Sequence, residues 1–337
     1  MNNPTVCVII PYYNGSKYIE RSANSVLAQT IAPNEFLVVD DGSSIEESEK
    51  LKYISEKLGF KVLRKENGGQ GSARNFGVEN TTSDFISFLD QDDFYLKNHI
   101  EILLSGIEKN DPHFGWVYAD LAEADEDGNI IRWENITHHS RHPKRFISDL
   151  IGSDMHILPS ASLINRVAFK SVGGFDPQFT GYEDDDLFLR MFRKGYKNYF
   201  IDQAVTVWCI NNNSTSYSIK MSRSRLKYFK KLVRFFPDEP DKSRYYIKDL
   251  IFNRFNSQII GEAFRSVFVS NTPQSKKMSQ HKSELIDIAN QYTKIMLNNK
   301  YLPLKIKIKI FLQKELINTR SKCILTFCYF VYRKILK

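Results

Sequence analysis

Four short apolar segments alternate with helix-like segments in the first ninety residues, and this alternation constrains the fold more than any other feature. The apolar segments have the length and composition of strands covered on both faces: residues 6–10, 36–39, 61–63 and 85–89. Helix-like stretches lie between them. Because a short loop cannot return a strand into parallel register, the pattern predicts an α/β fold with a Rossmann-like, mostly parallel sheet flanked by helices.

Polar residues follow three of these predicted strands at the point where each strand ends. They are the segments 11–14, 40–43 and 90–93, and the glycine-rich segment 67–71 follows the remaining strand. Ligands of parallel α/β sheets bind beyond the carboxyl ends of the strands. The sequence therefore predicts one binding site at this edge of the sheet.

The segment Asp90-Gln91-Asp92-Asp93 places three carboxylates within four residues. Carboxylates this close repel one another and resist desolvation, and a divalent cation among them would relieve both costs. Such a cation would hold a phosphate-bearing ligand. A solvated acidic turn is the alternative, and this motif taken alone does not exclude it.

The other polar segments suit a nucleotide. Asp41 can accept the imide N–H of a uracil or thymine base, and Pro11 and Tyr13 can flank that base. The alternative for Asp41 is a purely structural role, turning the chain ahead of Gly42.

The glycine-rich segment has two possible uses. Gly69 and its neighbouring glycines let the backbone approach a ligand closely, and Arg74 offers a fork of donors for phosphate or carboxylate. Arg74 fits equally well as a structural partner of Asp40 or Asp90. The segment is neither a P-loop nor a dinucleotide fingerprint, which weakens the case for a kinase or a dehydrogenase.

A second acidic segment, Glu183-Asp184-Asp185-Asp186, precedes an apolar helical run. Acids at a helix start gain from the helix dipole and from capping, so a structural role is open. A carboxylate here can also act as a general base.

Four motifs in this order and spacing resemble family 2 glycosyltransferases, which have the GT-A fold. They are Val-Ile-Ile-Pro-Tyr-Tyr-Asn, Val-Asp-Asp-Gly-Ser, Asn-Gly-Gly-Gln-Gly-Ser-Ala-Arg-Asn-Phe-Gly and Phe-Leu-Asp-Gln-Asp-Asp. The resemblance covers about the first 215 residues. It implies inverting transfer of a sugar from a nucleotide diphosphate donor, usually a UDP-sugar, with Mn²⁺ or Mg²⁺.

The resemblance also implies roles for single residues. Asp92 matches the metal ligand, and Asp90 faces the donor ribose or the metal. Asp184 matches the general base and Glu183 its neighbour, with no covalent intermediate expected. The chain departs from the family at Asn211, which stands about where many relatives carry a metal-ligating His.

The resemblance and the composition together predict four regions. A catalytic domain is expected over 1–215, with a nucleotide-sugar half over 1–98 and an acceptor half over 99–215. Helix-like stretches predict a helical region over 216–300, followed by a tail over 301–337. The last two regions form the helical C-terminal appendage of the predicted fold.

The tail is basic and apolar. Residues 301–337 hold nine Lys or Arg and one Glu, so the tail accounts for the whole formal net charge of +8. This composition predicts a basic amphipathic segment lying on an anionic membrane surface, although packing on the catalytic domain or an oligomer contact is the alternative. The rest of the chain carries no basic stripe, so nucleic acid is not an expected partner.

Scattered cysteines indicate a reducing compartment, and the predicted first strand begins too early to leave room for a signal peptide. We therefore expect a cytoplasmic enzyme, peripheral on the inner face of the cytoplasmic membrane. Its expected acceptor is a growing surface glycan (O-antigen, capsule or similar) or a lipid-linked saccharide. The alternatives are a nucleotide-sugar-processing enzyme on the same scaffold and a catalytically degenerate scaffold protein.

Overall fold

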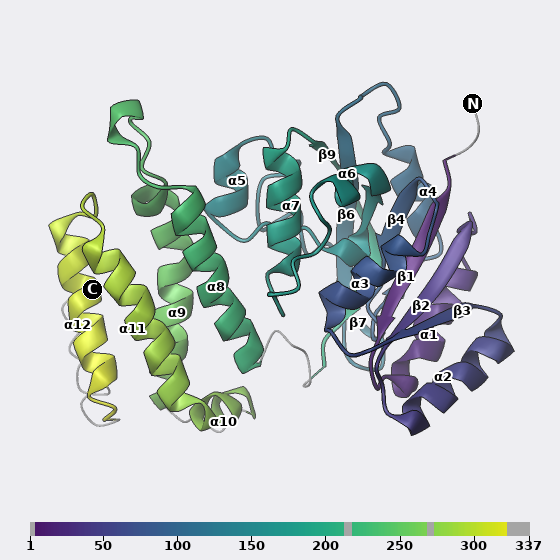
Figure 1. Cartoon of the computed structure of the whole chain (residues 1–337), viewed down its shortest axis with the longest axis horizontal. Coiled ribbons are helices and arrows are strands. Elements are labelled where there is room, and N and C mark those ends of the chain that lie inside the picture. The colour runs from purple at the N-terminus through teal and green to yellow at the C-terminus, as the bar shows by residue number, and fades with distance from the viewer. Residues whose placement is uncertain (1–3, 212–217, 268–272, 322–337) are drawn as a thin grey trace. The chain divides into compact units, whose positions relative to one another are not determined.

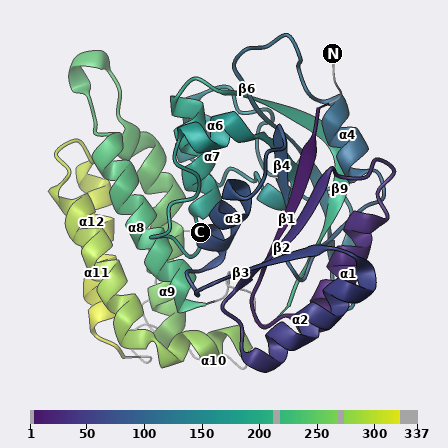
Figure 2. The ribbon, with the colours of Figure 1, turned by 45° about the vertical axis from the view of Figure 1, so that its right-hand side comes forward.

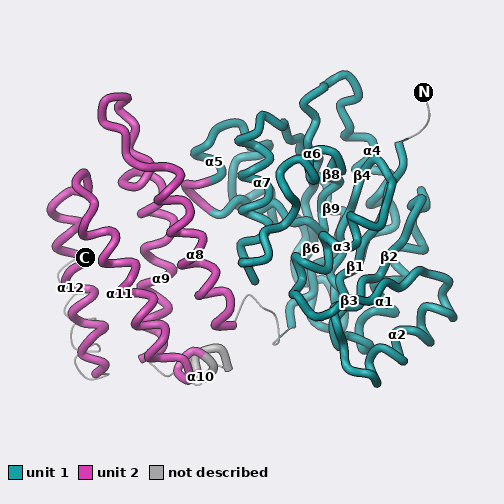
Figure 3. The backbone as a smooth tube through the Cα atoms, in the orientation of Figure 1, with its two compact units in different colours: residues 1–150, 154–212 teal, residues 151–153, 213–337 magenta. Residues whose placement is uncertain are grey.

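The computed structural model describes residues 4–211, 218–267 and 273–321. Its contacts divide the chain into two compact units, which Figure 3 distinguishes by colour. The first, the sheet unit, comprises residues 1–150 and 154–212. The second, the helical unit, comprises residues 151–153 and 213–337.

One sheet forms the centre of the sheet unit. Its strands are β1 Val6–Tyr12, β2 Glu35–Asp41, β3 Lys61–Lys65, β4 Phe85–Phe88, β5 Phe94–Tyr95, β6 Phe114–Ala124, β7 Ile130–Arg132, β8 Ser162–Asn165 and β9 Lys197–Cys209. They lie in the order β3-β2-β1-β4-β8-β6-β9-β5, with β7 paired to β6. The helices of this part of the chain are α1 Ser16–Leu27, α2 Ile45–Leu58, α3 Gln70–Glu79, α4 His99–Ser105, α5 Ile147–Ile151, α6 Arg166–Ser171 and α7 Glu183–Arg193, with a 3₁₀ turn at Pro159–Ala161.

The strands predicted from the apolar segments form the parallel part of the sheet. β1 pairs in parallel with β2 and with β4, and β2 pairs in parallel with β3 (Figure 1). All seven residues of β1 are buried, because helices cover both of its faces. Parallel pairing brings the carboxyl ends of these strands to one edge, where the predicted site residues begin.

Alternate residues of β1 face different helices. Val8 and Ile10 pack in one core cluster with residues of α1, α2 and α4. On the opposite face, a Cβ added at Gly77 of α3 would meet the Ile9 side chain at 2.6 Å. The glycine therefore allows α3 to pack directly on the sheet, and Figure 2 shows α3 across the strands from α1 and α2.

Strands from the second half of the sheet unit make the sheet mixed. β8 runs antiparallel to both β4 and β6, whereas β6 and β9 are parallel. β5 and β7 add two further antiparallel pairings. The predicted α/β class with flanking helices is confirmed, and the sheet is mixed because β8 separates its two parallel parts.

The helical unit confirms the predicted helical appendage. Its helices are α8 Ile219–Phe235, a 3₁₀ turn Pro240–Lys242, a π turn Ile247–Ile251 that leads into α9 Phe252–Val267, α10 Pro273–Gln280, α11 Lys282–Asn298 and α12 Leu304–Asn318. Phe229 contacts both Phe255 and Tyr292, so rings from three helices share one core.

Only part of the predicted tail is described, because residues 322–337 lie outside the described ranges. In α12, lysines alternate with isoleucines from Lys305 to Ile310. Successive residues of a helix point about 100° apart, so this alternation distributes both kinds of side chain around the helix. Over this stretch α12 therefore does not have the separate basic and apolar faces predicted for an amphipathic tail. None of the described helices combines the length and apolar character needed to span a bilayer.

Candidate active site

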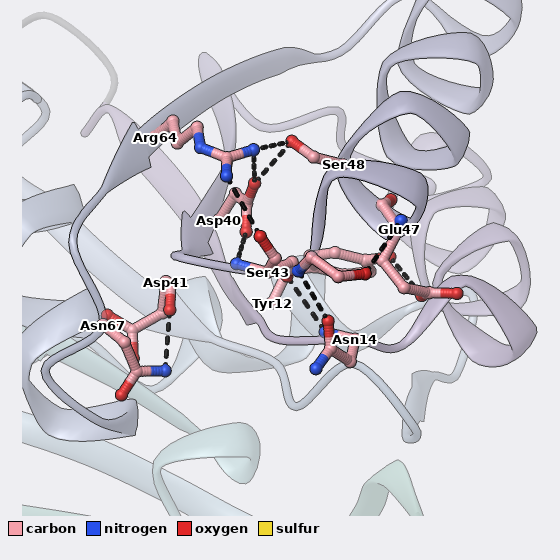
Figure 4. Close-up of polar contacts among 10 residues, drawn as sticks. Tyr12, Asn14, Asp40, Asp41, Ser43, Glu47, Ser48, Arg64 and Asn67 are labelled. Atoms are coloured by element: carbon pink, nitrogen blue, oxygen red, sulfur yellow. Dashed lines mark hydrogen bonds and ion pairs between the residues drawn. The ribbon is translucent and has the colours of Figure 1, made fainter.

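The loops that follow β1, β2 and β4 are joined by hydrogen bonds at the carboxyl edge of the sheet. The Asn14 backbone N–H donates to Ser43 Oγ at 3.0 Å, and the Ser44 N–H donates to Asn14 Oδ1 at 3.0 Å (Figure 4). The Tyr13 N–H donates to Gln91 Oε1 at 2.9 Å. The polar segments that the sequence placed at separate strand ends therefore lie together.

Asp40 and Glu47 anchor these loops (Figure 4). Asp40 is fully buried and accepts from the Ser43 N–H at 2.9 Å and from Arg64 at 3.1 Å. Glu47 accepts from both the N–H and the hydroxyl of Ser16 at 2.9 Å. These bonds lower the pKa of Glu47 to about 2, with the Ser16 backbone as the largest contributor.

Asp41 connects the end of β2 to the glycine-rich loop. Its buried carboxylate accepts from the backbone N–H groups of Gly68 and Gly69 at 3.0 and 2.7 Å. It also pairs with Lys65 at 2.8 Å, the residue directly opposite Asp41 in the β2–β3 register. Sequence reasoning missed Lys65, because only the strand register brings the two together.

The remaining predicted donor-binding residues of the first half differ in exposure. Pro11 is buried within β1, whereas Tyr13 is 50% exposed. Gly69 has a φ of +87°, which disfavours any side chain, and a Cβ there would meet nothing within 4 Å. The backbone of Gly69 is therefore open to approach, and its contact with a donor stays a prediction.

The acidic segment forms a turn, closed by a 3.1 Å bond from the Asp93 N–H to the Asp90 carbonyl. The Asp93 carboxylate points inward and accepts from the Cys209 N–H at 2.8 Å. The Asp92 carboxylate accepts from the side-chain amide of Asn211 at 2.6 Å. The residue that departs from the family pattern thus contacts the predicted metal ligand.

The carboxylates of this turn act on one another. Burial raises the pKa of Asp92, and the negative charge of Asp90 raises it further. Burial, followed by Asp92 and Asp90, raises the pKa of Asp93 well above its usual range. A carboxylate whose charged form is disfavoured in this way gains from a nearby cation.

The oxygen-rich side chains of Asp90, Asp92 and Asn211 are of the kind that Mg²⁺ and Mn²⁺ prefer. Within the described ranges, no three His, Cys, Asp or Glu side chains are grouped closely enough to hold a metal ion. The residues therefore fit a cation bound mainly by oxygens of its ligand, and they do not fit a cage made by the protein alone.

Arg74 joins the two acidic motifs. Its Nη2 donates to Asp90 Oδ1 at 2.5 Å, and its Nη1 lies 3.7 Å from Glu183 Oε1. The guanidinium also lies over the rings of Phe88 and Phe175, at 5.7 and 5.2 Å from their centroids. Of the two structural partners that the sequence left open for Arg74, the structure has Asp90.

The predicted catalytic acids begin α7. Asp184 Oδ1 accepts from the Asp185 N–H at 2.8 Å, and Glu183 Oε2 accepts from the Gly181 N–H at 2.6 Å. Burial raises the pKa of Asp184 well above its usual range, and Asp185 and Glu183 add to this effect. A carboxyl group with a raised pKa can take up a proton nearer neutral pH than an ordinary Asp.

Comparison with known proteins shows that the sheet unit is similar to glycosyltransferases. The family model described as glycosyl transferase family 2 matches residues 7–173. An uncharacterized glycosyltransferase of Rickettsia typhi is 32% identical over 195 residues, covering 57% of this chain. The chain spans 59% of the length of that relative and 31% of a second one from Rickettsia conorii.

Solved structures agree on the fold. Residues 1–349 of TarS from S. aureus, in complex with UDP, superpose with a TM-score of 0.64 at 16% identity, covering 98% of this chain and 91% of that one. A mannosyltransferase from Pyrobaculum calidifontis, in complex with GDP-Man and Mn²⁺, superposes with a TM-score of 0.54 at 16% identity, covering 96% of this chain and 89% of that one. The GT-A fold expected from the four motifs is confirmed.

Proposed function

Since this chain belongs to glycosyltransferase family 2, we propose that it transfers a sugar, with inversion, from a nucleotide diphosphate donor to a hydroxyl group of a glycan. One observation carries this proposal: a single guanidinium, that of Arg74, contacts Asp90 of the donor-side turn and Glu183 of α7. This contact supports a site in which the donor-side and acceptor-side motifs face one point, as a direct transfer between two substrates requires.

In this proposal residues 1–98 bind the nucleotide sugar and residues 99–215 bind the acceptor. Asp41 accepts the imide N–H of a uracil base, which favours a UDP-sugar, and Tyr13 packs on the base beside Pro11. The open backbone at Gly69 supports close approach of the donor. Asp90 contacts the donor ribose or the cation in this proposal, and the 32% exposure of its side chain supports that role.

The proposed chemical step uses Asp184 as the general base. Asp184 takes the proton of the acceptor hydroxyl while the hydroxyl oxygen attacks the anomeric carbon. The bond from that carbon to the diphosphate breaks on the opposite side, which inverts the configuration. The raised pKa of Asp184 supports this role, because the matched base must accept a proton near the working pH.

Asp92, with Asp90 beside it, would hold Mn²⁺ or Mg²⁺ against the donor diphosphate. When bound, the cation would neutralise the charge that develops on the departing diphosphate. Asn211, which stands about where the family resemblance expects a His, contacts Asp92 through a neutral amide. We propose that the chain relies on few protein ligands for this cation.

The proposed acceptor is a surface glycan or a lipid-linked saccharide, reached from the cytoplasmic face of the membrane. Support comes from the basic composition of residues 301–337 and from exposed apolar residues on α12, including Leu304 and Phe311. Basic charge and exposed apolar side chains suit peripheral binding to an anionic surface, although α12 does not sort them onto separate faces. Truncation before residue 301 should release the protein from vesicles containing anionic lipid in a flotation assay, and retained binding would refute the membrane proposal.

A panel of nucleotide sugars tests the function. We expect the protein with Mn²⁺ to show a thermal shift with UDP, and to release UDP from one UDP-sugar when a saccharide acceptor is supplied. Formation of a nucleotide sugar from a sugar phosphate would instead support the nucleotide-sugar-processing alternative. Absence of both binding and turnover across the panel would favour a degenerate scaffold.

A further inference from the structure

Arg74 links the two acidic motifs, but the proposed mechanism gives it no part in the chemical step. It lies on α3, contacts the acidic turn after β4, and reaches the first residue of α7. We infer that Arg74 is a positioning residue whose buried guanidinium fixes both Asp90 and Glu183. It thereby sets the distance between the donor and the general base without touching the donor. Its catalytic consequence rests on the proposed function, but the bridge itself does not.

Burial separates Arg74 from any ligand. Its side chain is 4% exposed, and its Nε is buried without a hydrogen-bond acceptor among the described residues. Phe88 and Phe175 cover the guanidinium. Asp90 is the more exposed member of the pair, so a donor would contact that carboxylate and not the arginine behind it.

The contacts of Asp90 fix its orientation. Gln70 Nε2 and Arg74 Nη2 both donate to Oδ1 of Asp90, at 2.6 and 2.5 Å. Two donors on the same oxygen hold the carboxylate plane in one orientation. Arg74 thereby acts on the donor through Asp90.

Glu183, the other carboxylate that contacts Arg74, is also held by two partners. One of its oxygens accepts from the Gly181 N–H and the other lies near Arg74. This arrangement fixes the first turn of α7, which carries Asp184. Glu183 is then a holder of the base and not a second base.

The charges around Asp184 also support a positioning role for Arg74. Asp185, Glu183 and Asp154 disfavour the ionised form of Asp184, and Arg74 is a cation that interacts with Asp184. Removing the carboxylate partners of a buried cation leaves a costly unpaired charge, and so does removing the cation from its carboxylates. The Arg74 bridge should therefore affect both the stability of the protein and the position of Asp184.

Separate measurements of affinity and turnover test the inference. We expect the Kd of Arg74→Lys for UDP to stay within about tenfold of the wild-type value. Loss of a charged contact with the donor would raise the Kd by more than this. The kcat of this variant should fall by about a hundredfold, the scale of a misplaced reacting group. Arg166→Gln is the matched control, because Arg166 binds the Ser83 and Thr82 carbonyls before β4, at the opposite edge of the sheet. A loss of UDP affinity beyond tenfold with unchanged kcat would overturn the inference.

The pH profile supplies a readout that a donor contact would not move. Removing the cation beside Asp184 should shift the acid limb of kcat/KM to higher pH in Arg74→Gln, and an unshifted limb would contradict the inference. If Arg74→Gln does not fold, Glu183→Gln gives the same comparison of kcat with UDP affinity from the other partner.

A double-mutant cycle tests the bridge without any substrate. We expect Arg74→Gln and Glu183→Gln each to lower the Tm, and the double variant to lose less than the sum of the two, since they share one interaction. Additive losses would contradict the bridge. If the wild-type protein fails to bind or turn over any nucleotide sugar, the proposed function fails while this cycle still decides the bridge.

Discussion

Two sets of carboxylates at the same sheet edge differ in what surrounds them. Asp40 and Asp41, at the end of β2, and Glu47, in the first turn of α2, accept hydrogen bonds from backbone N–H groups, hydroxyls or cations. Asp92, Asp93 and Asp184 lie close to other carboxylates, which raise their pKa values in addition to burial. The hydrogen bonds of the first set stabilise its charged carboxylates, whereas crowding in the second set costs stability, which agrees with the ligand chemistry that we propose for Asp92 and Asp184.

The largest effect is expected at Asp92, which belongs to the set of carboxylates that lie close to one another. Asp92→Ala should abolish metal-dependent turnover of the donor, and chelation by EDTA should have the same effect on the wild type. The physical reason is the loss of the proposed cation ligand beside the diphosphate. Donor turnover measured with and without Mn²⁺ checks this, and unchanged activity in the variant would remove the metal assignment.

Asp184→Asn should lower transfer by about a hundredfold or more, the scale of general-base assistance. Affinity for UDP should be retained, because Asp184 is proposed to act on the acceptor. The Tm should stay equal or rise, since the substitution removes a buried charge crowded by Asp185 and Glu183. A fall in Tm as large as that expected for Asp40→Asn would contradict the division of the carboxylates into two sets.

Asp40→Asn should give the opposite pattern. Asp40 is fully buried and accepts from a backbone N–H, a hydroxyl and Arg64. Losing hydrogen bonds to a charged group should lower the free energy of unfolding by about 1.5–3 kcal/mol. Chemical denaturation measures this change, and a loss in the range of a neutral surface substitution would remove Asp40 from the stabilising set.

The smallest expected effect is the pH dependence at Glu47, whose pKa is lowered to about 2. A carboxylate with a lowered pKa contributes stability that is complete above its ordinary pKa of 4.5 and is lost as the pH falls toward 2. The Tm difference between the wild type and Glu47→Gln should therefore shrink as the pH is lowered through this window.

Asp184 should show the opposite slope. Because its pKa is raised, its ionisation costs stability as the pH rises, so the advantage of Asp184→Asn should grow with pH. Parallel slopes for the two variants, measured by thermal unfolding at several pH values, would contradict the division into two sets.

The first half of the sheet could be predicted because its strands are continuous apolar segments with polar ends. β1 to β4 match those segments, and the loops after them meet as expected. Beyond residue 98 the pattern gave no strand order. The place of β8 between β4 and β6 depends on antiparallel pairing that no local motif specifies.

The site was predictable as a set of residue types and not as a set of contacts. The acidic motifs are legible because charged residues rarely cluster beside apolar segments. The bridge through Arg74 and the pair of Asp41 with Lys65 were not, since each depends on register or on packing between distant elements. Sequence reasoning left open the structural partner of Arg74, which only three-dimensional packing could decide.

The contacts between the acidic turn and the end of β9 have a consequence for folding. Asp92 bonds to Asn211 and Asp93 to Cys209, across sequence separations of 119 and 116 residues. Contacts this far apart form late, because closing so long a loop is entropically costly before other contacts compensate. A nascent chain shorter than about two hundred residues would lack both of these contacts, so we expect the Asp92 and Asp93 carboxylates to reach their final positions only at the end of folding of the sheet unit.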